Sequence, residues 1–349
     1  MVLDELAKRA HEEGLSALLY YGIKDTSLLG LLPPEFISGL ARHYYNNASF
    51  NLFAQKKLGE VLAAFETAGI DAIVLKGLSL MDTVYPNIAV RPITDIDLLI
   101  KENDLPRAKN KLNELGYACE EYCREDFYNG EIAIDIHSSL LNSVRVKSRH
   151  KTCEVDNAEL WRDSGSMALD GRKARVLSPE DQLISLCLHL FYHHGLKRLI
   201  WFVDIYALLN THENVFNWDR FLDKCRRFKV KSPVYYCLSA AEIKLGTLVP
   251  REVLERLKPP AEDILTRKIL DLAMHKDISE KVRFYFILLS LEKLKDKLLY
   301  LFAIILPRPS VLRAVYLPGY SLPRLYFFHF KAIFVESSKA VGSLLDTSP

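Results

Sequence analysis

The sequence lacks the features that mark secreted, membrane-spanning or fibrous proteins. Its six cysteines form no C-x-x-C pair and no dense framework, which predicts free thiols in a reducing cytoplasm. The most apolar stretch, residues 298–307, is about half as long as the roughly 20 residues of a membrane span. No internal repeat and no low-complexity tract is present. What remains is a globular chain of 349 residues, long enough for about two or three domains.

The chain also has little excess charge of either sign. Its formal net charge of +2 argues against a uniformly basic surface, so nucleic acid is an open but not a favoured partner. The exception is the segment 281–349, which has 10 Lys and Arg residues, 4 Asp and Glu residues and many aromatics. Such a tail could make peripheral contact with an anionic membrane or bind a nucleic acid. The alternative is an ordinary helix with a solvated basic face.

Apolar residues recur at helical spacing near both ends of the chain. This periodicity predicts helices over 4–20 and 35–68. Ser178-Pro179 followed by two acids signals a further helix start, with helices expected over 179–194 and 200–209. The later periodic segments predict only helices, over 217–228, 231–244, 250–257, 263–274 and 280–303.

A short apolar strand, residues 73–75, runs into a glycine turn. Lys76 and Gly77 follow this strand directly, and Ser79 lies at the start of a helix expected over 78–85. Backbone N–H groups at a helix start bind phosphate well, and the lysine adds a positive charge. This signal is weak alone and depends on the acidic strand that follows.

Two aspartates lie on the same face of the next predicted strand. In the segment ITDIDLLI, Asp95 and Asp97 share one face, whereas Ile96, Leu98 and Ile100 share the other. Aspartate is a poor strand former, so two in one short strand suggest a function. Arg91 precedes a proline in extended backbone shortly before this strand. It either reaches the same cleft or pairs on the surface with Asp82 or Glu102.

A third carboxylate follows in a predicted hairpin. Asn129-Gly130 is a strong signal for a tight turn between two strands. Asp135 then lies in the middle of the second strand, with His137 on the same face. Glu131 has the same parity but lies near the turn. We interpret His137 either as a contact to substrate or metal ligands or as a satisfied core histidine.

Three clustered carboxylates repel one another unless a cation lies between them. Oxygen ligands suit Mg²⁺ or Mn²⁺, which commonly also hold substrate phosphates. Asp95, Asp97 and Asp135 are therefore the candidate catalytic and metal-binding residues of a phosphoryl or nucleotidyl transfer site.

The same residues carry a resemblance to a known family. Together they resemble the nucleotidyltransferase superfamily of DNA polymerase beta, and more closely a bacterial branch described as uncharacterised nucleotidyltransferases. The chain departs from the superfamily pattern in two places, because the turn places its serine at Ser79 and the gap from Gly77 to Asp95 is long. The segments that carry the resemblance are Lys76-Gly77, Arg91-Pro92, Asp95-Ile96-Asp97-Leu98-Leu99, Gly116-Tyr117 and Ile134-Asp135-Ile136-His137.

The resemblance implies an α+β fold. We expect a small mixed β-sheet core over residues 69–178, between an N-terminal helical unit, 1–68, and a larger all-helical domain, 179–349. It also implies transfer of a nucleoside monophosphate from a nucleoside triphosphate, with ATP favoured, to an unidentified acceptor. A small molecule or a protein side chain is favoured as acceptor, and pyrophosphate leaves.

The resemblance implies a role for each of the site residues. Asp95 and Asp97 would hold both metal ions, and Asp135 would hold the catalytic one and help to deprotonate the acceptor. Lys76, Gly77 and Ser79 would grip the triphosphate, and Arg91 would neutralise charge on the leaving group.

Alternatives remain open at this point. The core could bind nucleotide as a regulator or scaffold without turnover, or modify RNA as a toxin. On the helix 179–194, His189 and His193 have the spacing of metal ligands and His194 follows, but no H-E-x-x-H motif exists. These histidines could contact zinc or substrate, or simply lie at a domain boundary. Asp204, in an apolar helix, needs a partner such as Lys197, Arg198 or a histidine.

Overall fold

The computed structural model describes residues 2–119, 126–141, 153–169, 172–246, 249–259, 288, 294–316 and 319–345. Its N-terminal part is helical, with α1 (Val2–Glu12), α2 (Ser16–Ile23), the short helix η1 (Ser27–Leu31) and the long α3 (Pro34–Thr67). The prediction of one helix over 4–20 is wrong. Gly14 has a φ of +74° and separates α1 from α2, because this left-handed conformation cannot continue a helix.

The central sheet has seven strands, and it is mixed as predicted. Its order is β3-β4-β5-β2-β1-β7-β6, with β2 parallel to β5 and β1 parallel to β7. The hairpin predicted around Asn129-Gly130 is confirmed, because β4 and β5 pair antiparallel. The strands are β1 (Ala72–Val74), β2 (Asp95–Ile100), β3 (Ala118–Cys119), β4 (Asp126–Tyr128), β5 (Ala133–His137), β6 (Gly165–Leu169) and β7 (Arg172–Val176).

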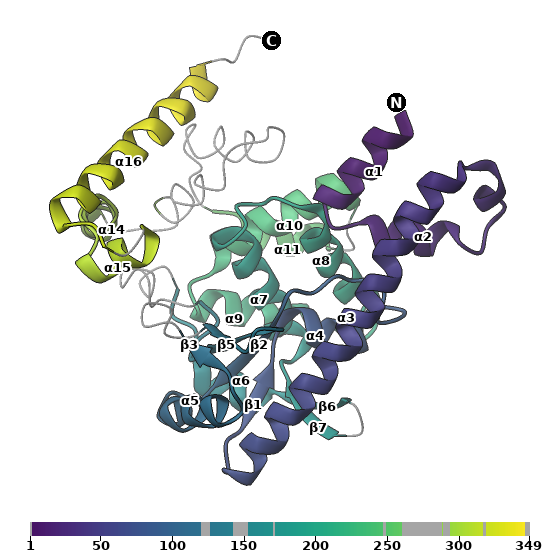
Figure 1. Cartoon of the computed structure of the whole chain (residues 1–349), viewed down its shortest axis with the longest axis horizontal. Helices are drawn as coiled ribbons and strands as arrows, with labels where there is room; N and C mark the ends of the chain where they lie inside the picture. The colour runs from purple at the N-terminus through teal and green to yellow at the C-terminus, as the bar shows by residue number, and fades with distance from the viewer. Residues whose placement is uncertain are drawn as a thin grey trace.

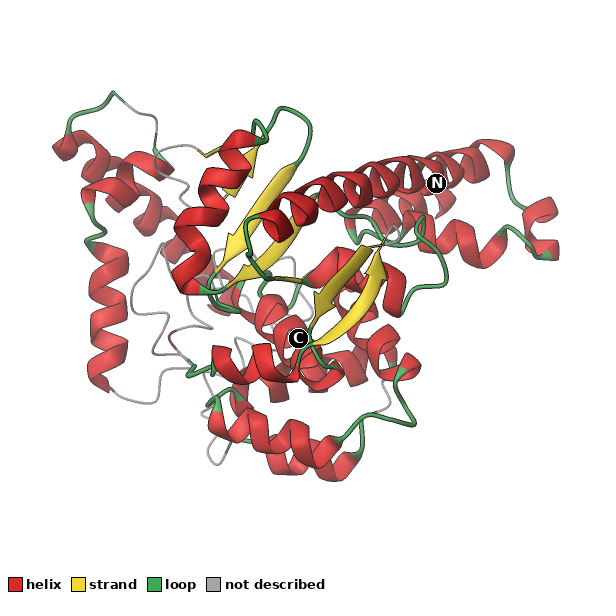
Figure 2. Ribbon diagram, turned by 90° about the horizontal axis from the view of Figure 1, so that it is seen from below, coloured by secondary structure: helices red, strands yellow, loops and turns green. Residues whose placement is uncertain are grey.

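Helices cover both faces of this sheet (Figures 1 and 2). Ile96 and Leu98 of β2 share a buried core with Leu58 of α3 and Leu112 of α5 (Leu105–Glu114). Leu99 points to the opposite face and belongs to a second core, built mainly by the later helices. Side-chain alternation therefore puts Asp95 and Asp97 on the face that these later helices cover.

The remaining helices agree with most of the predicted ones. The predictions over 179–194, 200–209, 217–228, 231–244 and 250–257 are confirmed. The predicted helix 263–274 and the first part of 280–303 lie outside the described residues. The observed elements are α4 (Lys76–Thr83), η2 (Glu102–Asp104), α6 (Asn157–Asp163), α7 (Pro179–Tyr192), α8 (Leu199–Thr211), α9 (Trp218–Arg227), α10 (Lys231–Leu245), α11 (Arg251–Leu257), α14 (Leu294–Ile305), α15 (Pro309–Val315) and α16 (Leu322–Leu345).

Two further observations concern the chain as a whole. Among the described helices, none combines the length and apolarity needed to cross a membrane. The predicted division into three units stays a prediction, although the first and last of them touch. The backbone N–H of Leu199, which begins α8, donates to the Glu13 carboxylate at 2.5 Å.

Candidate functional site

Two of the three predicted carboxylates lie side by side. In the parallel register of β2 and β5, Asp97 is the direct partner of Asp135. The carboxylates of Asp97 and Asp135 and the imidazole of His137 each offer one ligand atom, all within 4.8 Å of one another. They form the one group of three or more such side chains that could hold a metal ion within the described residues. Asp95 shares the face of Asp97 but is not part of this group, and its Oδ1 accepts a hydrogen bond from Thr94 at 3.0 Å.

His137 contacts the carboxylate cluster directly. Its Nε2 lies 2.7 Å from Oδ1 of Asp97, and both side chains are buried. Its Nδ1 is also buried and has no hydrogen-bond partner among the described residues. His137 is therefore a contact to a candidate metal ligand, and the interpretation as a satisfied core histidine is wrong.

Lys76 is the positive charge nearest to the cluster. Its Nζ lies 2.6 Å from Oδ1 of Asp97. Lys76 has a φ of +48°, a left-handed conformation that is strained for a residue with a side chain. It begins α4 directly after β1 and Leu75, so the chain turns sharply from the sheet at the carboxylates. The predicted helix 78–85 thus starts two residues earlier than expected.

The electrostatics of the three aspartates differ sharply. Burial and the negative charges of Asp97, Asp126 and Asp95 together raise the pKa of Asp135 to about 8. Burial and the charge of Asp97 also raise the pKa of Asp95. Burial also tends to raise the pKa of Asp97. The contacts with Lys76 and His137 have the larger effect and hold the pKa of Asp97 well below its usual value. The cluster thus has one firmly ionised carboxylate and two that resist ionisation unless more positive charge arrives.

Asp126 is a fourth acid that the sequence analysis did not identify. It is the cross-strand partner of Asp135 in the antiparallel pair of β4 and β5. Glu131, the weak fourth candidate, lies instead outside β5, with its carboxylate 3.7 Å from Nζ of Lys57. A two-residue turn at Asn129-Gly130 would place Asp126 opposite Ala133, and the pairing with Asp135 arises because Tyr128 pairs with Ala133 instead, across a four-residue loop.

Gly77 is required by close packing. A Cβ at this position would lie 2.7 Å from Cγ2 of Ile93 and 3.0 Å from Nη1 of Arg91. Ser79, two residues on, is buried. Its hydroxyl donates to the Lys76 carbonyl at 2.9 Å and accepts from Nε2 of Gln182 at 2.9 Å. The Ser79 hydroxyl therefore holds the start of α4 through one hydrogen bond within the helix and a second one to α7.

Arg91 lies at the boundary between the sheet and α8. Its Nε and Nη2 donate to both carboxylate oxygens of Asp204, at 3.2 and 2.8 Å, and both side chains are buried. The Tyr85 hydroxyl donates to Asp204 at 2.5 Å, and the guanidinium lies 4.7 Å from the centre of the Trp201 ring. Asn51 of α3 holds the same loop by donating to the Arg91 carbonyl at 2.8 Å.

The expected ion pairs of this region are therefore wrong. Asp204 pairs with Arg91, not with Lys197, Arg198 or a histidine, and Arg91 does not pair on the surface. Asp82 instead accepts from the Gln55 amide at 3.0 and 3.1 Å. The sequence could not reveal the Arg91–Asp204 pair, because 113 residues separate its members.

His189 of α7 and the two histidines that follow this helix form an aromatic group beside Trp201. Nε2 of His189 lies 2.9 Å from Nε2 of His194, whose ring stacks on Trp201 at 4.4 Å. The rings of His189 and His193 stack at 5.1 Å. Burial, together with the charge of Lys76 and the neighbouring histidines, lowers the pKa of His189 well below its usual value. These histidines are not part of the metal-binding group found within the described residues, so the zinc interpretation gains no support.

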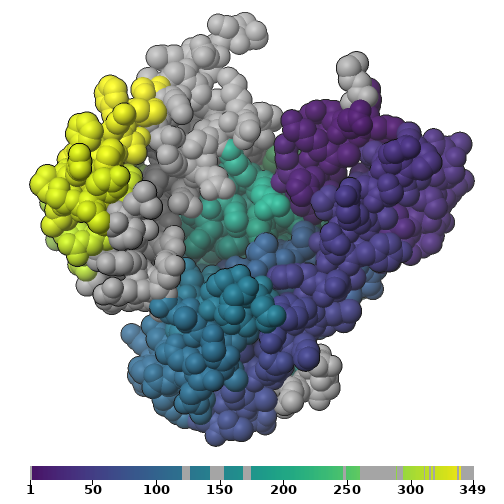
Figure 3. Space-filling model, viewed as in Figure 1, coloured from purple at the N-terminus to yellow at the C-terminus, as the bar shows by residue number. Residues whose placement is uncertain are grey.

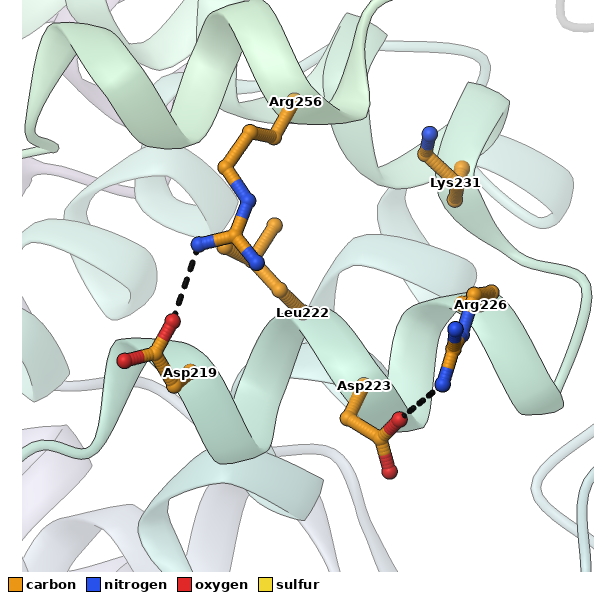
Figure 4. A pocket seen from close by; sticks show the side chains of 6 residues that line it. All are labelled: Asp219, Leu222, Asp223, Arg226, Lys231 and Arg256. Atoms are coloured by element: carbon orange, nitrogen blue, oxygen red, sulfur yellow. Dashed lines mark hydrogen bonds and ion pairs between the residues drawn. The ribbon is translucent and has the colours of Figure 1, made fainter.

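A separate pocket of about 250 Å³ lies between α9, α10 and α11 (Figure 4). It contains two internal ion pairs, Arg256–Asp219 at 2.8 Å and Arg226–Asp223 at 2.6 Å. None of the predicted site residues lines it, so it is distinct from the carboxylate cluster. Its lining consists of Asp219, Leu222, Asp223, Arg226, Lys231 and Arg256.

Comparisons with known proteins bear on this site. No curated protein matches the chain. Two solved structures resemble it at a TM-score of 0.37 each. The antibiotic-resistance factor ANT(2″)-Ia is 12% identical, with 50% of this chain and 90% of that chain covered. An antigenic nucleotidyltransferase-like protein from Paracoccidioides brasiliensis is 14% identical, with 56% and 90% covered.

A family model described as an uncharacterised nucleotidyltransferase matches residues 3–246, well over half of the chain. This match includes the glycine turn, the Asp95–Asp97 strand, Asp135, and His189 with the two histidines that follow α7. It confirms the resemblance inferred from residues 76–137. The chain therefore belongs to this family of uncharacterised nucleotidyltransferases.

Proposed function

We propose that the protein is a divalent-metal-dependent nucleotidyltransferase. It moves a nucleoside monophosphate from a nucleoside triphosphate, with ATP favoured, to an acceptor and releases pyrophosphate. The observation that carries this proposal is the placement of Asp97 beside Asp135 on parallel strands, next to the start of α4. Carboxylates beside a helix start combine a site for cations with a site for phosphate.

The donor set fits a divalent cation. Asp95, Asp97 and Asp135 would hold Mg²⁺ or Mn²⁺, and the raised pKa values of Asp95 and Asp135 indicate that the cluster lacks positive charge. When bound, the ion supplies the charge that neutralises the phosphate oxygens. His137, whose Nε2 touches Asp97, orients that carboxylate and offers a further ligand atom.

The residues around the cluster have separate tasks. Asp135 would hold the catalytic ion and help to deprotonate the acceptor hydroxyl, and the bound cation would lower the pKa of about 8 that this carboxylate has in the metal-free cluster. Lys76 holds the Asp97 carboxylate in place through their ion pair. It is also the positively charged side chain that would bind a triphosphate oxygen. The backbone N–H groups at Gly77 and the next residue begin α4, where an anion is favourable.

Two predicted phosphate contacts take positioning roles in this proposal. Ser79 is buried and its hydroxyl is engaged on both sides, so we assign it to holding the Lys76–Gly77 turn in place. Arg91 is held by Asp204 and Trp201, which fixes the guanidinium against the Gly77 turn. Because Asp204 already pairs with the guanidinium, we assign Arg91 to positioning this turn.

Label transfer from nucleotide tests the proposal. Purified protein would be incubated with each α-phosphate-labelled nucleoside triphosphate, Mg²⁺ or Mn²⁺, and a cell lysate that supplies small-molecule and protein acceptors. We expect wild type to label a product and Asp95→Asn and Asp97→Asn to label none. Asp71→Asn is the matched control, because Asp71 is exposed and pairs only with Lys101 among the described ion pairs. Equal labelling by wild type and Asp97→Asn would refute the proposal.

A further inference from the structure

The helix α16 exposes an aromatic face. Its exposed large side chains are spaced three and four residues apart, so they lie along one side of the helix. The exposed fractions are 63% for Phe327, 37% for Phe328, 75% for Phe334 and 37% for Val335, with Phe330 beside them at 42%. We call these five residues the aromatic face.

The opposite side of α16 is the side that packs. Leu325 is buried, the Tyr326 hydroxyl donates to the Pro307 carbonyl at 2.8 Å, and Nε2 of His329 lies 2.7 Å from the Ile304 carbonyl. The aromatic face therefore points away from the rest of this helical group. In Figure 3 the yellow atoms of α16 lie at the outer edge of the molecule.

The helix α14 has a similar exposed stripe. Leu294, Leu298, Phe302 and Ile305 are exposed by 71%, 57%, 62% and 44%. An exposed apolar surface of this extent on a folded chain marks an interaction site. A surface helix normally turns its apolar side inward, so the arrangement in α14 and α16 requires a partner.

The charged residues around the aromatic face indicate what kind of partner binds there. Residues 294–345 contain seven Lys and Arg residues and two Asp and Glu residues. Arg324 and Lys331 are exposed on the same side of α16 as the phenylalanines. We propose that α16, with α14 beside it, docks on an anionic lipid membrane surface, with the phenylalanines among the lipid chains and the two cations at the headgroups.

Other partners fit this surface less well. In a dimer, each copy would bury its Arg324 and Lys331 in an apolar interface, where the other copy contributes the same positive charges and no partner for them. Buried unpaired charges are unfavourable. A nucleic acid requires many phosphate contacts, but among the described side chains of α16 only Arg324 and Lys331 are exposed cations beside the aromatic face. A lipid surface satisfies both the apolar side chains and the charges.

Vesicle co-sedimentation of the full chain tests this proposal without any reliance on nucleotide chemistry. We expect binding to vesicles of phosphatidylcholine mixed with phosphatidylglycerol, and weaker binding to phosphatidylcholine alone. The double variant Phe327→Ser, Phe334→Ser should lower the partition constant at least about tenfold. Arg324→Gln and Lys331→Gln should each lower it about fivefold on anionic vesicles only.

The matched control replaces apolar residues that are equally exposed elsewhere. Leu31 and Leu52 are 78% and 58% exposed, and Leu31→Ser, Leu52→Ser should bind like wild type. Any of three results would overturn the proposal. Wild type could stay in the supernatant, or the phenylalanine variant could bind as well as wild type. Alternatively, light scattering or oligonucleotide titration could show a dimer or a nucleic-acid complex that only the phenylalanine variant loses.

Discussion

At the scale of single residues, the cluster depends on how Asp97 is neutralised. Lys76 and His137 both contact Oδ1 of Asp97, at 2.6 and 2.7 Å. No cation forms an ion pair with Asp135 within the described part of the chain, and burial and its acidic neighbours raise its pKa. A carboxylate that is easily protonated thus lies directly beside one that is firmly ionised.

The raised pKa of Asp135 predicts a pH dependence of stability in the metal-free protein. Between the unfolded value of about 4 and the folded value of about 8, the folded chain holds a proton that the unfolded chain loses. The free energy of unfolding should therefore fall as pH rises, by at most about 1.4 kcal/mol per pH unit. Urea titrations from about pH 5 to about pH 8, with a chelator present, would measure the free energy of unfolding of wild type and of Asp135→Asn. The wild-type value minus the variant value should fall with this slope. A flat difference would contradict the raised pKa.

His137 should act through metal affinity. His137→Ala removes the imidazole that contacts Asp97, so we expect Mn²⁺ binding to weaken about 10- to 100-fold. Paramagnetic resonance of free Mn²⁺ measures this directly. His212→Ala is the control, since the His212 ring hydrogen-bonds the Leu208 carbonyl of its own helix and is not part of the metal-binding group. Unchanged Mn²⁺ affinity in His137→Ala would remove His137 from the site.

At the scale of elements, the turn from β1 into α4 is the tightest constraint near the site. Gly77 lies so close to Ile93 and Arg91 that any side chain would displace one of them. Gly77→Ala should destabilise the protein by about 1–3 kcal/mol and lower transfer activity by about a hundredfold. Chemical unfolding and the labelling assay measure the two effects.

The control for this substitution is another helical glycine. Gly39 in α3 has no atom within 4 Å of an added Cβ, and its φ is not positive. Gly39→Ala should leave activity unchanged and add up to about 1 kcal/mol of stability, because alanine favours helix. Full activity in Gly77→Ala would show that the turn tolerates movement.

A buried charge network ties α6, α7 and α9 together behind the site. Nζ of Lys224 is fully buried and lies 2.6 Å from Asp181 and 2.8 Å from Asp163. Lys224→Met would leave the buried Asp181 without its cation, whereas Asp163 would keep its pair with Arg220 at 2.8 Å, so we expect a loss of about 3–5 kcal/mol in the free energy of unfolding. Arg226→Met should change stability by less than about 1 kcal/mol, because its pair with Asp223 is on the surface. Thermal unfolding of both variants checks the contrast.

Local patterns in the sequence were sufficient to predict strand β2, the β4–β5 hairpin and the start of α7. Strand alternation correctly placed Asp95 and Asp97 on one face, and Asn129-Gly130 correctly predicted the hairpin that carries Asp135. The helix start at Ser178 is also confirmed, with its hydroxyl accepting from the Asp181 backbone at 3.3 Å. All three depend on residues close in sequence, where turn and cap chemistry determine structure.

At the scale of the whole molecule, contacts between distant segments could not be predicted. The parallel pairing of β2 with β5 brings His137 to Asp97 across 40 residues, and no local signal specifies that register. Arg91 reaches Asp204 and Ser79 reaches Gln182 across still longer separations. The His137–Asp97 contact follows from strand pairing, and the other two follow from how α7 and α8 pack on the sheet. All three are properties of the assembled core.

The most direct test of the central claim is calorimetric titration of ATP into the protein with Mn²⁺ present. It needs no knowledge of the acceptor. We expect metal-dependent ATP binding by wild type and by Asp71→Asn. We also expect at least about a tenfold loss of affinity in both Asp97→Asn and Asp135→Asn. ATP binding of equal affinity in all four proteins, or binding that does not need the metal, would contradict the assignment of Asp97 and Asp135 to a metal–nucleotide site.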